Sequence, residues 1–197
     1  MARLRVRRRR LASRFLLLVA LVGAVLVGAP GAGDSAEPSA EVLSALELTP
    51  LPRAAAPAFT LADLDGRALS LASLRGQTVL IYFWATWCPY CQKELPTTVQ
   101  ELARRYRDRR LVVLAVNMEE GRDKVRAWAK KHGISVPVLL DGAGEVSGDY
   151  RVTATPTAVL VDRDGRTVAR AVGTRSWTSD RARPLWDTLL ANPAQAR

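Results

Sequence analysis

The chain has few of the side chains that bind metals or cross-link small domains. Its 197 residues include two cysteines, Cys88 and Cys91, and one histidine, His132. A structural zinc site needs four ligands, and His132 lies about forty residues from the cysteines, so the sequence predicts no metal site. A purely structural disulfide that closes four residues would constrain the unfolded chain by only about 2 kcal/mol. Neither a metal site nor a purely structural disulfide accounts well for the cysteine pair.

The net positive charge is small outside the N-terminus. The formal net charge is +10, but seven of the 29 basic residues precede Phe15, and without them the net charge is about +3. The remaining charges form no basic face and are not interleaved with aromatic residues, so we expect no nucleic-acid partner. The early basic residues are Arg3, Arg5, Arg7, Arg8, Arg9, Arg10 and Arg14.

Charged residues are absent from the nineteen positions 15–33. As a helix this run would span roughly 28 Å, close to the hydrocarbon thickness of a bilayer. The basic flank is expected to stay in the cytoplasm, so the rest of the chain would be exported. No cysteine follows the run, which excludes a bacterial lipid anchor, and RRRRLASRF is a poor match to a twin-arginine signal.

A cleavable signal peptide is the alternative to a membrane anchor, because the strongly apolar part covers only the fifteen residues 15–29. Small residues stand at Ala29 and Gly31, but Pro30 lies between them and no A-x-A site appears before Ala54. These features favour an uncleaved anchor.

Three regions follow from this composition. Residues 1–33 are the basic N-terminus with the anchor or signal peptide. Residues 34–56 are rich in Ala, Pro and Ser and predict a flexible linker, with a short helix around residues 41–48. Residues 57–192 have the pattern of one folded domain, and no internal repeat is apparent.

Strands and helices alternate along this domain. Residues 59–71 predict a hairpin that turns at Asp65 and Gly66. Buried strands are expected at 78–85, 111–118 and 136–141, and a second hairpin at 157–173. Helices are expected at 89–108, 122–133, 144–150 and 181–190; Pro89 opens the first, Gly133 ends the second and Pro184 starts the last. This order predicts an α/β domain with a mixed sheet and helices on both faces, preceded by an N-terminal hairpin.

The cysteine pair lies where the first long helix is predicted to begin. A cysteine at a helix entry meets backbone N–H groups without intrahelical partners and the positive end of the helix dipole, and both favour thiolate over thiol. Cys88 holds that place, so we expect it to be the attacking nucleophile. Cys91, one turn further along, brings the second sulfur within bonding reach. The pair can therefore reduce a substrate disulfide through a mixed disulfide.

The segments FWATWCPYC and TATPT, the second about 65 residues after the first, resemble the thioredoxin superfamily. The leading segment PAFTLADLDGRALSLASLRG, the extra strand and helix at 111–133 and the C-terminal half resemble the membrane-tethered TlpA-like and ResA-like bacterial thioredoxins. The resemblance covers roughly residues 57–190. It implies a thioredoxin-like fold, the activity of a thiol:disulfide oxidoreductase and no cofactor.

The resemblance also implies roles for residues around the cysteines. Cys88 is then the exposed nucleophile, Cys91 the resolving thiol, and both form the redox-active disulfide. Pro156 matches the cis-proline that faces the active site, and Thr155 offers backbone groups to an extended substrate. Glu94 matches the acidic residue of CxxCxxE and would relay the proton of Cys91; the alternative is an ordinary solvated helix glutamate. Substrate-facing residues would also include Trp87, Pro89 and Tyr90.

Two departures from the family pattern concern proton transfer and substrate. Thioredoxin has a buried aspartate in the strand before its active site, where this chain has Tyr82, so a proton relay must rest on Glu94 or water. Proteins of cytochrome c maturation usually carry GxPET at the cis-proline, where this chain has TATPTAV. This difference argues against a dedicated cytochrome c role.

The family implies reduction of specific protein disulfides, such as cysteine pairs awaiting haem or copper, with electrons from a membrane-embedded thiol carrier. The domain would lie in the periplasm, held at the bacterial inner membrane by the N-terminal helix, or secreted there if that segment is cleaved. Alternatives are a disulfide oxidase or isomerase, a non-enzymatic scaffold protein, and a peroxiredoxin-type peroxidase. The last needs a threonine three residues before its cysteine, where this chain has Ala85.

Overall fold

A computed structural model describes residues 37–191 of the chain. The predicted anchor or signal peptide at residues 15–33 lies outside this range. Between residues 37 and 191, no helix has both the length and the apolar character needed to cross a membrane.

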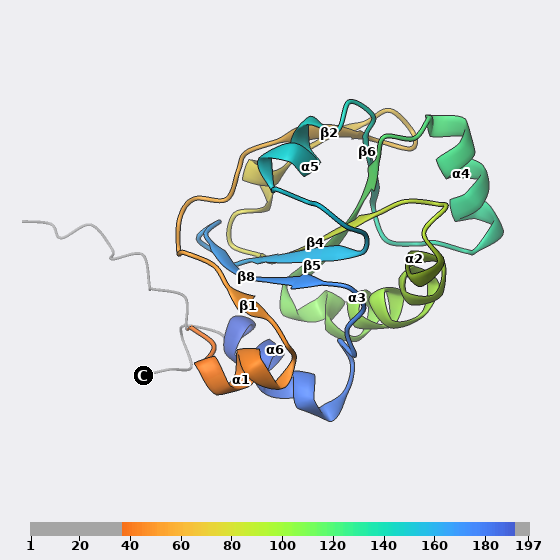
Figure 1. Cartoon of the computed structure of the whole chain (residues 1–197). Coiled ribbons are helices and arrows are strands. Elements are labelled where there is room, and N and C mark those ends of the chain that lie inside the picture. Colours follow the sequence, from red (N-terminus) through yellow and green to blue (C-terminus); the bar gives the residue numbers. More distant parts are fainter. Residues whose placement is uncertain (1–36, 192–197) are drawn as a thin grey trace, which may run out of the picture. The chain divides into compact units, whose positions relative to one another are not determined.

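One eight-stranded mixed sheet forms the centre of the domain (Figure 1), in the order β1-β8-β7-β4-β5-β6-β2-β3. The strands β4, β5 and β6 run parallel to one another. On one side β7 is antiparallel to β4 and β8 is antiparallel to β7, and on the other side β2 is antiparallel to β6 and β3 is antiparallel to β2. Both predicted hairpins, β2–β3 and β7–β8, are therefore confirmed. The strands are β1 (Thr49–Pro50), β2 (Thr60–Asp63), β3 (Ala68–Ser70), β4 (Thr78–Trp84), β5 (Leu111–Met118), β6 (Val138–Asp141), β7 (Thr157–Val161) and β8 (Thr167–Val172).

Helices cover both faces of the sheet, as the alternating pattern predicted. In Figure 1, α1, α3 and α6 lie below the central strands and α5 lies above them. The α-helices among the described residues are α1 (Ala40–Ala45), α2 (Pro89–Glu94), α3 (Gln100–Tyr106), α4 (Arg122–Lys131), α5 (Glu145–Asp149) and α6 (Arg183–Leu189). The chain thus has the α/β thioredoxin-like fold expected from its sequence.

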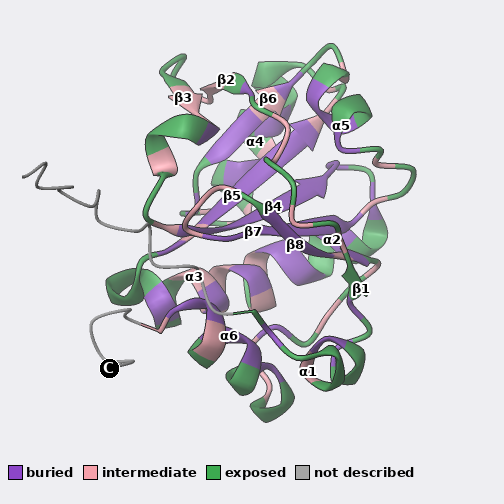
Figure 2. Cartoon of the chain, turned by 90° about the vertical axis from the view of Figure 1, so that its left-hand side faces the viewer, coloured by how far each residue is buried: buried purple, intermediate pink, exposed green. Residues whose placement is uncertain are grey.

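The central strand β4 is buried along its whole length, which explains its unbroken apolar sequence. Successive side chains of a strand point to opposite faces, so Leu80, Tyr82 and Trp84 pack in one core cluster with residues of α1, α2, α3, α4 and α6. Ile81 and Phe83 pack in a second cluster with residues of α5. Figure 2 shows these central strands as buried and the outer faces of the helices as exposed. Tyr82 therefore points to the same side of the sheet as α2.

The helix predicted at residues 89–108 is not continuous. Between α2 and α3 the chain forms a π-helical turn, η2 (Leu95–Val99), and after α3 a 3₁₀ turn, η3 (Arg107–Arg109). Pro96 has no N–H to donate to the preceding turn and its ring crowds that turn, so the helix widens locally. The Thr97 hydroxyl donates to the Lys93 carbonyl oxygen at 2.6 Å and satisfies part of the interrupted ladder.

The prediction of a flexible linker up to residue 56 is wrong for residues 37–56. Strand β1 pairs with β8, and helix α1, which Ser39 caps, packs on the domain. Leu43, Leu46 and Leu48 are each 5% exposed and belong to the core cluster on the α2 side of the sheet. Three leucines within six residues supply enough apolar surface to bind this segment to the sheet. The folded domain therefore begins before Pro57.

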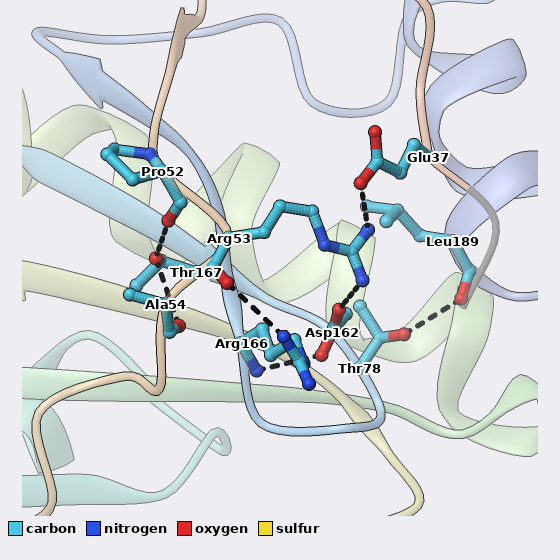
Figure 3. Close-up of polar contacts among 9 residues, drawn as sticks. All are labelled: Glu37, Pro52, Arg53, Ala54, Thr78, Asp162, Arg166, Thr167 and Leu189. Atoms are coloured by element: carbon cyan, nitrogen blue, oxygen red, sulfur yellow. Dashed lines mark hydrogen bonds and ion pairs between the residues drawn. The ribbon is translucent and has the colours of Figure 1, made fainter. Parts of the chain in front are cut away.

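Polar contacts also tie this segment to the β7–β8 turn (Figure 3). The Arg53 guanidinium pairs with two carboxylates, those of the buried Asp162 and of Glu37. The Arg53 Nη1 lies 3.2 Å from the Glu37 Oε1. The Thr167 hydroxyl donates to the Pro52 carbonyl oxygen at 2.6 Å. These contacts lie where β7 ends, whereas the cysteines follow the opposite end of the neighbouring antiparallel strand β4.

Candidate active site around Cys88 and Cys91

Cys88 caps the N-terminus of α2, as the position of Pro89 predicted. Its Sγ accepts a hydrogen bond from the Cys91 backbone N–H at 3.2 Å and donates one to the Thr155 carbonyl oxygen at 3.4 Å. Both cysteines are free thiols in this structure. The expectation of an exposed nucleophile is wrong for this state, because Cys88 is only 2% exposed. Its sulfur turns inward to satisfy the helix end and the Thr155 carbonyl.

Cys91 lies one turn further along α2 and is fully buried. Burial, followed by the hydrogen bond with Cys88, raises the pKa of the Cys91 thiol from 9.0 to about 12. The thiol form therefore dominates near neutral pH. To act as a nucleophile, Cys91 needs a nearby group that accepts its proton.

Glu94 provides a buried carboxyl group on the same helix. The residue is 5% exposed, and its Oε1 accepts the Arg175 backbone N–H at 2.7 Å while its Oε2 accepts the Tyr82 hydroxyl at 2.9 Å. It is not a solvated helix glutamate. Burial raises the pKa of Glu94, although the hydrogen bonds from Arg175 and Tyr82 act in the opposite direction. A carboxylate held in this way is a suitable proton acceptor for a buried thiol.

Tyr82 is the residue whose role the sequence did not indicate. It is 1% exposed, and burial followed by the charges of Glu94 and the two cysteines raises its pKa far above the ordinary value. The hydroxyl therefore keeps its proton and donates it in the hydrogen bond to Glu94. The alternation along β4 was the available signal, since it places Tyr82 on the inward face with Leu80 and Trp84.

The expected substrate-facing residues surround Cys88. Trp87 and Tyr90 are each 65% exposed. The Thr155–Pro156 peptide bond is cis, as predicted. Val172, 49% exposed, pairs with Thr157, the residue that follows Pro156, and sequence reasoning missed it. The large apolar side chains that remain exposed among the described residues are Trp87, Tyr90 and Val172. Trp87 and Tyr90 flank Cys88 in the sequence, and Val172 lies beside the strand that follows the cis-proline.

A second buried carboxylate braces the loop before Cys88. Glu120 accepts the Thr86 backbone N–H and the Thr86 hydroxyl, both at 2.6 Å, and the Asn117 amide at 2.8 Å. Burial acts to raise the pKa of Glu120, but the Lys124 ammonium at 2.6 Å and the Thr86 donors outweigh it and hold the pKa below the usual range. From the other side, the Gln92 amide donates to the Thr86 carbonyl oxygen at 2.7 Å. This brace, which links residues 34 apart in sequence, fixes the entry to α2.

His132 is not close to a set of metal ligands. It follows α4, and its ring stacks on Trp128 with 4.2 Å between centroids. Over residues 37–191, no three His, Cys, Asp or Glu side chains are grouped so that they could hold a metal ion.

The chain is similar in sequence and in structure to several known proteins. The model of the AhpC/TSA family matches residues 52–170. The thiol-disulfide oxidoreductase ResA of Bacillus cereus is 34% identical over 118 residues, which cover 60% of this chain and 68% of that protein. The thioredoxin-like protein YneN of Bacillus subtilis is 39% identical over 113 residues, which cover 56% of this chain and 65% of that protein. A crystal structure of a thiol:disulfide interchange protein from Chlorobium tepidum superimposes with a TM-score of 0.62 at 29% identity, covering 71% of this chain and 98% of that one.

Proposed function

The chain belongs to the AhpC/TSA family of the thioredoxin superfamily and is a ResA-like thiol-disulfide oxidoreductase, and from this premise we propose that it reduces specific protein disulfides. The observation that supports the proposal best is the arrangement of the two thiols. Cys88 caps α2 beneath exposed apolar side chains, and the fully buried Cys91 donates its backbone N–H to the Cys88 sulfur at 3.2 Å. Cys88, next to the exposed side chains of Trp87 and Tyr90, would meet the substrate, and Cys91 would complete the exchange.

In the first step, the Cys88 thiolate attacks one sulfur of the substrate disulfide. A bond forms between the Cys88 Sγ and that sulfur, the substrate S–S bond breaks, and the departing substrate thiolate takes up a proton. The Cys91 N–H already points at the Cys88 Sγ and can donate to the attacking sulfur. The exposed rings of Trp87 and Tyr90 provide apolar surface against which the substrate chain packs.

In the second step, Cys91 loses its proton to Glu94 and attacks the Cys88 sulfur. The mixed disulfide breaks, the second substrate thiol leaves with the bonding pair and a proton, and a Cys88–Cys91 disulfide remains. Two electrons have then passed from the protein to the substrate. Because burial raises the pKa of Cys91 to about 12, this step depends on the buried carboxylate.

The proposal extends to compartment and partners. The basic N-terminus and the apolar run at residues 15–33 support export, with the domain in the bacterial periplasm, tethered to the inner membrane or released from it. Cytosolic reductants do not reach such a site, so a membrane-embedded thiol carrier would re-reduce the cysteines. The substrates would be protein cysteine pairs awaiting haem or copper.

The environment of Cys91 supports one direction of electron flow. A strong disulfide-forming oxidant needs a reduced state that is stabilised relative to the disulfide. At Cys91, burial disfavours the thiolate, and the hydrogen bond with Cys88 acts in the same sense. The site therefore supports a reductase over an oxidase or isomerase.

Reduction of insulin tests the enzymatic role. With dithiothreitol as electron source, we expect the wild-type protein to accelerate insulin precipitation, and Cys88→Ser to fall to the rate of dithiothreitol alone. Thr97→Ser, which keeps the hydroxyl bonded to the Lys93 carbonyl, is the matched control on the same helical region. A wild-type rate equal to that of dithiothreitol alone would favour the scaffold role.

A further inference from the structure

The hydroxyl of Tyr82 connects the central strand to the carboxyl group of the candidate site. It donates to Glu94 Oε2 at 2.9 Å across the interface between β4 and α2, and both residues are buried. The other carboxyl oxygen accepts the Arg175 N–H at 2.7 Å. Each oxygen of Glu94 thus has a donor on a different element, which fixes the plane of the carboxyl group.

We propose that Tyr82 is a positioning residue for disulfide exchange, and that its hydroxyl holds Glu94 oriented and ionised so that Glu94 accepts the Cys91 proton. The inference deepens the proposed function and rests on it. Tyr82 acts through Glu94 and takes no part in bond formation. In the step concerned, the Cys91 proton moves to the Glu94 carboxylate, the Cys91 sulfur bonds to Cys88, and the substrate sulfur leaves with the electron pair of the broken bond.

The charges around Glu94 set the direction of the effect. Arg175 and Trp177 face the carboxyl group from the loop after β8, and Tyr82 faces it from β4. The two cysteines act on the Tyr82 hydroxyl from the start of α2. Burial disfavours the carboxylate, and the Tyr82 hydroxyl is one of the groups that offset this burial. Without that donor the carboxyl group would keep its proton to higher pH and would accept the Cys91 proton less readily.

The chain offers a matched control for removal of this hydroxyl. Tyr150 is 3% exposed, and its hydroxyl donates to the Pro57 carbonyl oxygen at 2.8 Å. It packs in the second core cluster, on the face of the sheet opposite to Tyr82. Tyr82→Phe and Tyr150→Phe therefore each delete one buried, hydrogen-bonded hydroxyl, and only the first touches Glu94.

The test is stopped-flow reaction of the reduced full-length protein with Ellman's reagent between pH 5 and pH 9. The first release of nitrothiobenzoate reports attack by Cys88, and the second reports attack by Cys91 on the mixed disulfide. We expect Tyr82→Phe to leave the first phase unchanged, to slow the second about tenfold at pH 7, and to move its acid limb up by about one pH unit. Tyr150→Phe should leave both phases as in the wild type. In a Glu94→Gln background, Tyr82→Phe should add little further slowing.

An unchanged second phase in Tyr82→Phe, or equal shifts in both tyrosine variants, would overturn the role of Tyr82. If Tyr82→Phe does not fold, 3-fluorotyrosine at position 82 keeps the hydroxyl and makes it a stronger donor. This variant should move the acid limb of the second phase to lower pH, and an unmoved limb would equally overturn the proposal. Failure of the proposed function gives a different result, because the wild-type protein would then fail to accelerate insulin reduction, whatever the two tyrosine variants do with Ellman's reagent.

Discussion

Cys91→Ser is expected to accumulate mixed disulfides with its substrate proteins, whereas Cys88→Ser is expected to capture almost none. In Cys91→Ser the attacking sulfur is intact but the buried thiol that would release the substrate is missing. In Cys88→Ser the remaining thiol is fully buried, and burial raises its pKa to about 12. Turnover should fall at least about 100-fold in both variants. Non-reducing gels and mass spectrometry of complexes captured from extract measure the trapping.

The double variant Cys88→Ser/Cys91→Ser is the control for sulfur-independent binding. Partners that appear with Cys91→Ser and vanish on addition of dithiothreitol are substrates in mixed disulfide linkage. Equal capture by the two single variants would contradict the assignment of Cys88 as attacker and Cys91 as resolver.

Removal of residues 37–56 is expected to lower the stability of the domain strongly. A chain that begins at Pro57 should be less stable than one that begins at Glu37 by about 5 kcal/mol, because it lacks three buried leucines that contribute about 1.5–3 kcal/mol each. It also lacks Arg53, which pairs with the buried Asp162. Since whole domains have about 5–15 kcal/mol of stability, this loss removes about a third or more of the total. Urea denaturation followed by tryptophan fluorescence measures the difference.

The chain that begins at Glu37 is the reference, because it keeps Leu43, Leu46, Leu48 and the Arg53 contacts. Leu43→Ala in that chain should cost about 2–5 kcal/mol by itself. Equal unfolding midpoints for the two truncated chains would show that residues 37–56 behave as the linker that their composition suggested.

Local patterns predicted most of this fold. The apolar run that became β4 is buried at every position, the turn at Gly66 lies at φ 86° where glycine is favoured, and Pro89 opens α2 at its first turn. The CPYC motif and the TATPT segment are joined by the contact between Cys88 and Thr155, which are 67 residues apart. In these cases the signal lies in adjacent residues or in a family motif.

The features that the sequence did not reveal depend on contacts between distant segments. The hydrogen bond from Tyr82 to Glu94 joins a strand to a helix, and that from Thr86 to Glu120 joins two loops 34 residues apart. The spacing of apolar residues along the sequence does not indicate which distant residues form such hydrogen bonds. The composition of residues 37–56 wrongly predicted a linker, because alanine, proline and serine outnumber the three leucines that bind the segment to the core.

The central claim is that Cys88 and Cys91 form a reducing dithiol, and equilibration of the pair with glutathione buffers measures this most directly. The fraction of oxidised protein, read by alkylation and mass spectrometry across a series of glutathione ratios, gives the reduction potential. The buried, unionised Cys91 and its neighbouring carboxyl group predict a potential close to that of thioredoxin, about −270 mV, and in any case well below about −180 mV. A potential near about −120 mV, that of a strong disulfide-forming oxidant, would contradict the assignment.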